Sequence, residues 1–267
     1  MKKRFLLVLV CFVVSSSLFA HEFFVIPDEV KAYKSGDTVK IDALSTHYFT
    51  VGEELEPAEV NEVYAVKNGV KGADLPLTRN ADKVWYEAEY TLTDNTPVII
   101  VGNRKGGFYC TFTDGGYADG KKAEVAAANR GKTIAKSRYF AKYSKFYLKP
   151  DPKDTSFSTP LGHDIEIIPL DNPAKISKGI FSKAKFRVLY KGQPLPNAEI
   201  SATYDYYNYK TANAYAQSAK TDAKGEASFK IDNAGIWLVR VSDTRKSAFP
   251  DTDEDNLAAI VVFTVAP

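Results

Sequence analysis

Apolar and polar residues alternate along much of the chain, with the period of two that is typical of β-strands buried on one face. The clearest run is Thr38–Leu44. Turn signals such as Asn68-Gly69 and Asp114-Gly115-Gly116 lie between such runs. Further strands are predicted over residues 61–66, 83–90, 96–101, 181–190, 197–204, 226–230, 235–241 and 258–265. The pattern therefore predicts a mainly β protein.

One segment departs from this pattern. Residues 121–147 are rich in Ala and Lys and hold few strand formers before Tyr139. Ala and Lys favour helices, and Gly131 would interrupt one. We therefore predict one or two helices here, as a helical insertion within a β-rich region.

A domain boundary is predicted in the stretch Pro169–Pro173, where two prolines in five residues favour an extended link. The short strands beyond it, with turns between them, are typical of an immunoglobulin-like β-sandwich of the prealbumin or carboxypeptidase-regulatory kind. The predicted division is a signal peptide over residues 1–20, an N-terminal β-rich domain over 21–172 and the sandwich over 173–267.

The first 20 residues have the pattern of a cleaved secretory signal peptide. Three basic residues, 2–4, precede an apolar run over residues 5–14, and Ala20 supplies the small residue before the cleavage point. The apolar run is shorter than the roughly 20 residues that a membrane-spanning helix needs. We therefore expect an exported, periplasmic protein that does not span a membrane and whose mature chain begins at His21.

Charge and cysteine usage narrow the functional classes. Removal of the three basic residues with the signal peptide lowers the formal net charge from +2 to −1, so no basic excess remains to hold nucleic acid. Cys110 is then the only cysteine, so an intramolecular disulfide is excluded. We interpret Cys110 as a small buried strand residue. The sequence holds no phosphate loop, dinucleotide fingerprint or nucleophile motif. We therefore do not expect an enzyme.

Three histidines, His21, His47 and His163, are the candidate metal ligands. Cleavage after Ala20 would give His21 a free α-amine beside its imidazole, and these two nitrogens can chelate one ion. With a second imidazole they form a T-shaped set of three nitrogens, which suits Cu(II) or Ni(II). His47 ends a predicted strand and His163 precedes another. The alternative is that His21 is a frayed end and that the other two are ordinary surface or core residues.

Two further segments have competing interpretations. The tyrosine-rich stretch 204–209, with Tyr215, suits carbohydrate or protein recognition, but also the packing of alternate tyrosines in a hairpin. The acidic stretch 251–256 lacks the glycine and terminal glutamate of a calcium loop, so we interpret it as a solvated loop.

Several sequence blocks together resemble a family of periplasmic proteins of unknown function described as a nickel or cobalt transport component, the Co²⁺ ABC transporter periplasmic component or NikM-like proteins. The blocks are His21–Phe24 with Pro27, His47–Phe49, Gly107–Tyr109 with Thr113–Gly115, Gly162–Pro169 with Asn172–Pro173, Gly192–Glu199, and Thr221–Gly225 with Gly235–Trp237. The resemblance implies that Ni²⁺ or Co²⁺ is the bound ion, with Cu²⁺ also possible. It also implies a metal transporter of the inner or outer membrane as the partner.

Three functions follow from these observations. The first is a periplasmic metal-binding protein that assists nickel or cobalt uptake. The second is a structural or carbohydrate- or protein-binding exported β-protein. The third is a histidine-brace copper oxidase, because oxidative polysaccharide-cleaving enzymes also begin with a mature histidine on a β-sandwich.

Overall fold

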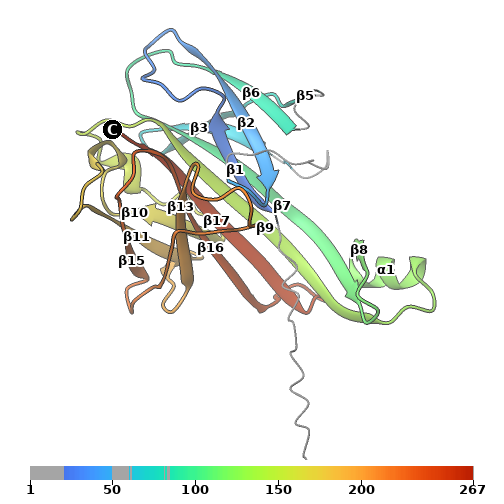
Figure 1. Cartoon of the computed structure of the whole chain (residues 1–267). Helices are drawn as coiled ribbons and strands as arrows, with labels where there is room; N and C mark the ends of the chain where they lie inside the picture. Colours follow the sequence, from blue (N-terminus) through green and yellow to red (C-terminus); the bar gives the residue numbers. More distant parts are fainter. Residues whose placement is uncertain (1–20, 50–59, 61, 81, 83–84, 267) are drawn as a thin grey trace, which may run out of the picture.

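The computed structural model describes residues 21–49, 60, 62–80, 82 and 85–266. The predicted signal peptide lies outside these residues. Within them the chain is built from strands, which form one large sheet and two smaller ones (Figure 1).

The first half of the chain forms a β-sandwich. One of its sheets has the order β1 (Glu22–Pro27), β2 (Thr38–Thr46), β6 (Trp85–Thr91) and β5 (Thr78–Asn80). The facing strands have the order β4 (Val70–Asp74), β3 (Glu62–Lys67), β7 (Val98–Phe112) and β9 (Ile134–Lys149). One layer therefore holds β1, β2, β5 and β6, and the other holds β3, β4, β7 and β9. This is the strand order of an immunoglobulin-like sandwich.

The second half repeats this arrangement. The strand β11 (Lys183–Tyr190) lies between β10 (Ile165–Pro169) and β15 (Glu226–Lys230), and β12 (Gln193–Pro194) also pairs with it. The facing strands have the order β14 (Gln217–Lys220), β13 (Glu199–Tyr204), β16 (Gly235–Lys246) and β17 (Glu254–Val265). Two short 3₁₀ turns, η2 (Ser156–Ser158) and η3 (Pro173–Lys175), lie in the connections on either side of β10. The expected mainly β, immunoglobulin-like fold is thus confirmed.

The two sandwiches share one sheet. The last strand of each, β9 and β17, pair in parallel, with Arg138–Phe146 beside Glu254–Val262. This pairing fuses the two inner layers into a single sheet with the order β14-β13-β16-β17-β9-β7-β3-β4. Each smaller sheet then covers an opposite face of the large one, because the strand period of two sends neighbouring side chains to opposite faces.

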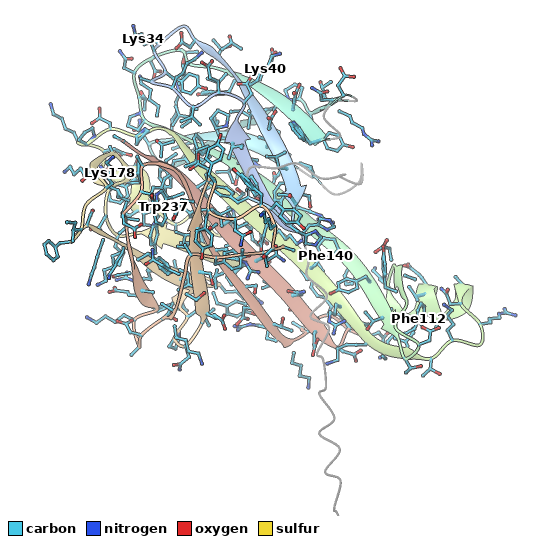
Figure 2. The ribbon with its side chains drawn as sticks, in the orientation of Figure 1. Lys34, Lys40, Phe112, Phe140, Lys178 and Trp237 are labelled. Carbon is cyan, nitrogen blue, oxygen red and sulfur yellow. The ribbon has the colours of Figure 1, made fainter. Side chains whose placement is uncertain are left out.

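Two hydrophobic cores follow from that alternation. Tyr143 and Trp237 belong to the core beneath the sheet of β10, β11 and β15. Phe146 and Leu238 belong to the core beneath the sheet of β1, β2 and β6. Figure 2 shows Trp237 inside the second sandwich. Close packing is required where β1 meets β7, because a Cβ at Gly102 would lie 2.4 Å from a methyl carbon of Val25.

The predicted helical insertion is confirmed in its first part and wrong in its second. The helix α1 spans Lys122–Ala128, but residues 134–149 form β9. Alternate side chains of β9 enter the two cores, and this burial outweighs the helix propensity of its Ala and Lys residues. A strand buried on both faces shows no simple polar and apolar alternation in its sequence.

A hairpin arm extends from the large sheet. The strand β7 continues to Phe112, well beyond the predicted residues 96–101, and pairs with β9 along its length. Its far end carries β8 (Tyr117–Asp119) and α1 (Figure 1). Cys110, Phe112 and Val125 form a small separate core there. Cys110 is a fully buried strand residue, as predicted, and burial raises the pKa of its thiol.

The acidic stretch 251–256 fixes the base of this arm. The Asp253 carboxylate accepts hydrogen bonds from the backbone N–H and the hydroxyl of Ser137, at 2.7 and 2.9 Å. Glu254 pairs with Arg138 at 3.1 Å, and Lys136 donates to the same carboxylate. Asp253 and Glu254 are therefore committed to contacts with β9, and the interpretation of the stretch as a solvated loop is wrong for residues 254–256, which belong to β17.

The predicted boundary at residues 172 and 173 falls inside the second sandwich, because β10 lies before it and pairs with β11. No helix among the described residues is long enough and apolar enough to cross a membrane.

Candidate functional site

His21 and His47 lie side by side at one end of the first sandwich. The register of β1 on β2 pairs Glu22 with Thr46, so the next pair outward is His21 opposite His47. Directly opposed residues of an antiparallel pair have adjacent side chains. The two imidazole rings accordingly lie 4.0 Å apart between centroids and are tilted by 36°. Two of the three predicted ligands are thus brought together.

The backbone on both sides of this histidine pair is anchored. The Lys142 ammonium, from β9, donates a hydrogen bond to the carbonyl oxygen of His21. The backbone N–H of Asn213 donates to the carbonyl oxygen of His47 at 2.7 Å. The edge of β1 is also held, because the Val25 N–H donates to the Ser144 hydroxyl at 3.0 Å. The position of His21 therefore depends on β9, and that of His47 depends on the loop between β13 and β14 of the second sandwich.

A buried ion pair lies next to the histidine pair. Glu22 accepts a hydrogen bond from the Tyr215 hydroxyl at 2.6 Å and pairs with Arg240 at 2.7 Å. Burial, followed by the adjacent Glu22 carboxylate, raises the pKa of Tyr215, so its hydroxyl stays a donor. These contacts tie the tyrosine-rich loop to β1. Glu22 is consequently committed to Arg240 and Tyr215.

Two basic side chains of the large sheet, Lys142 and Arg104, lie next to the histidine pair. Burial, together with the neighbouring Arg104 guanidinium, lowers the pKa of Lys142 to about 7. Arg104 is itself buried and donates to the Ser45 hydroxyl at 3.3 Å. A pKa of about 7 leaves Lys142 partly protonated at neutral pH, so the positive charge beside the histidines falls as the pH rises above 7.

A small cavity of about 20 Å³ lies beside His47. Its walls include Phe24, Phe49 and Tyr215. This volume holds about one water molecule. His47 thus lines a small cavity that it shares with the tyrosine-rich stretch.

His163 lies elsewhere in the molecule. It is buried, its ring stacks on that of Tyr143 at 4.5 Å, and its Nε2 lies 3.3 Å from the Tyr64 hydroxyl. Tyr143 follows Lys142 in β9 and points to the opposite face of the large sheet. The sheet therefore separates His163 from the other two histidines. The Asp164 carboxylate, next to His163 in the chain, accepts a hydrogen bond from the Tyr143 hydroxyl at 2.9 Å.

The donor set fits a metal ion only in part. No group of three or more His, Cys, Asp or Glu side chains in the described part of the chain is arranged to hold one. The two imidazoles supply two nitrogens, and the third donor would be the α-amine that cleavage before His21 creates.

Several residues next to the histidine pair could not be predicted from the sequence. Lys142 lies in the segment predicted as helix, and Arg240 lies in a predicted strand with no distinguishing neighbours. Tyr215 was noted only as part of the tyrosine-rich stretch. A usable signal existed in residues 22–27, because a short apolar run ending at a proline is typical of a buried strand, and such a strand would place His21 at its start.

Residues 18–245 match the family described as a domain of unknown function (DUF4198), and the chain belongs to this family. A comparison with curated proteins found no match.

Several solved structures show low similarity. The trypsin-activated alpha-2-macroglobulin from Escherichia coli is 11% identical with a TM-score of 0.24, over 93% of this chain and 16% of that chain, so the present chain spans only a small part of that protein. The human OSCAR ligand-binding domain is 10% identical with a TM-score of 0.22, over 92% and 100% of the two chains. The D0-D1 domain of intimin is 16% identical with a TM-score of 0.22, over 90% and 97%.

Proposed function

We propose that this protein is exported and binds one divalent transition metal ion through His21 and His47. The observation that carries the proposal is the contact between the two imidazoles, 4.0 Å apart, at a point where the predicted signal cleavage exposes an α-amine. The amine has an ordinary pKa of about 7.7 to 8.0 and is therefore available as a ligand close to neutral pH.

The proposed physiological role is to assist nickel or cobalt uptake, with the ion passed to a transporter of the inner or outer membrane. The resemblance of the sequence blocks to nickel and cobalt transport components supports this role. Three nitrogen donors bind Cu(II) more tightly than Ni(II) or Co(II) in the test tube, whatever the physiological ion is. Copper is therefore the most sensitive ion for testing whether the site exists. Nickel and cobalt are the ions that test the proposed role in uptake.

One added residue before His21 tests the proposed chelate. The added residue keeps every side chain but moves the free amine away from the imidazole. We expect this variant and His47→Ala each to bind Cu(II) and Ni(II) at least 100-fold more weakly than the mature protein in calorimetry. Affinity in the parent should fall as the pH is lowered, because the amine and the imidazoles must lose protons to bind.

The matched control is His163→Gln, which removes a histidine on the other face of the large sheet. This variant is expected to keep the parent affinity. Equal binding by the parent, the extended variant and His47→Ala would show that the site does not exist. A loss in His163→Gln as large as that in His47→Ala would place the ion elsewhere.

A further inference from the structure

A groove of about 530 Å³ opens at an edge of the second sandwich, away from the histidine pair. It lies where β11 and β15 of one layer meet β13 and β14 of the other. Its principal lining side chains are Lys183, Tyr204, Tyr207, Gln217, Lys230 and Asp232. The volume is in the range of small-molecule sites, and the proposed metal site uses none of these residues.

The groove is closed to an added peptide strand at its edge. The Gln217 side-chain amide donates to the Lys230 carbonyl oxygen at 2.8 Å and accepts from the Lys230 N–H at 2.9 Å. These two bonds occupy the N–H and C=O of Lys230, so at this position β15 offers no free backbone groups to an incoming chain. A ligand must therefore be recognised by side chains.

Aromatic rings form one wall. Tyr204 packs against Trp237 with ring centroids 5.0 Å apart, and Tyr207 lies edge-on to Tyr204 at 5.4 Å. Tyr207 keeps 42% of its surface exposed even though it is fixed by these contacts. A rigid, half-exposed phenol beside polar groups suits a ligand with an apolar face and a polar rim, which is the character of a sugar ring.

Two lysines, Lys183 and Lys230, line the groove together with the Asp232 carboxylate. Lys183 and Lys230 are directly opposed in the register of β11 and β15. Like charges in this position repel each other. Among the described residues no ion pair joins either lysine to a carboxylate, whereas the neighbouring Lys185 shares Glu226 with Arg187. A bound anion between the two lysines would relieve this repulsion.

We propose that this groove binds an acidic saccharide. One sugar ring packs on Tyr207, its carboxylate or sulfate lies between Lys183 and Lys230, and Asp232 accepts a hydrogen bond from a ring hydroxyl. The proposal is independent of the metal site, because it rests on different residues.

Three tetrasaccharide probes test the proposal by calorimetry and by amide NMR: a carboxylated oligogalacturonate, a sulfated heparin fragment and neutral cellotetraose. We expect at least one acidic probe to bind at least 10-fold more tightly than cellotetraose, with shifts of the Gln217 and Lys230 amides. Binding should weaken as salt is raised from 0.05 to 0.5 M. The two acidic probes distinguish the carboxylate from the sulfate.

The variants Lys230→Gln and Tyr207→Ala are each expected to lose at least 10-fold in affinity for the acidic probe. Lys224→Gln is the matched control, an exposed lysine in a turn of the same sandwich, and should bind as the parent does. The proposal is overturned if no acidic probe binds at millimolar concentration. It is equally overturned if Lys224→Gln loses as much affinity as Lys230→Gln, since the attraction would then be a general effect of charge.

Discussion

Replacement of Lys145 by methionine is expected to lower the free energy of unfolding by about 3–5 kcal/mol at pH 7.5. Lys145 and Glu166 form an ion pair whose side chains are only 4% and 1% exposed. Glu166 also accepts the Leu161 N–H at 2.7 Å, so the pair joins β9 to the segment leading into β10. Removing the lysine leaves a buried carboxylate without its cation, and denaturant unfolding would measure the cost.

The pH dependence separates this effect from a simple packing defect. Burial acts to raise the pKa of Glu166, but the Lys145 ammonium outweighs it and holds the pKa below its usual value. In the parent, this pair therefore stabilises the fold above about pH 4.5, and that contribution is lost as the pH falls further. In Lys145→Met the unpaired carboxylate has a raised pKa, so its destabilisation should shrink between pH 7.5 and pH 5.

Two comparisons complete this experiment. Lys67→Met breaks an exposed pair with Asp94 and should change stability little. The double variant Lys145→Met with Glu166→Leu should be more stable than Lys145→Met alone, because no charge is left buried. A destabilisation of Lys145→Met that does not vary with pH would show that the pair contributes only packing.

A fragment of residues 173–267 is expected to lack a cooperative thermal transition. The fragment omits β10, which leaves one side of β11 unpaired, and omits β9, which leaves β17 as an edge. It also exposes Leu238, Ile260 and Val262, which are buried in the core of the first sandwich. Omission of β10 also removes the buried Ile165 and Ile167 from the core of the second sandwich, and this further loss of apolar burial leaves too little stabilising free energy for a cooperative fold.

A fragment of residues 150–267 is the control, because it restores β10 while still lacking β9. It should show a cooperative transition, at a midpoint below that of the mature protein. If the shorter fragment instead unfolded at the same midpoint as the longer one, β10 would not be part of the folding unit, and the sequence-based boundary at residues 172 and 173 would hold.

Local pattern was sufficient to predict most strands of the second sandwich. The strands β11 and β15 alternate buried and exposed positions, β13 and β16 are rich in β-branched and aromatic residues, and clear turn residues separate them. The strand β9 was missed because both of its faces are buried and its Ala and Lys residues favour a helix. The parallel pairing of β9 with β17 joins residues more than 100 positions apart. Only tertiary packing determines such a contact, so no local signal predicted the shared sheet.

The candidate site was predictable to a similar extent. The chemistry of His21 follows from the predicted cleavage point, but its proximity to His47 depends on the register of β1 on β2, and β1 was not predicted as a strand. His163 resembled the other two in sequence. His163 is separated from His21 and His47 because it packs on Tyr143, whose side chain lies on the other face of the large sheet. Which face a residue of β9 occupies depends on the whole fold.

The central claim is that His21 and His47 bind one ion together with the free amine. Pulsed electron paramagnetic resonance of the mature protein loaded with one equivalent of Cu(II) tests it most directly, because modulation from the remote imidazole nitrogens counts the bound histidines. The account predicts two bound imidazoles in the parent and in His163→Gln, and one in His47→Ala. Two bound imidazoles in His47→Ala, or no imidazole modulation in the parent, would contradict it.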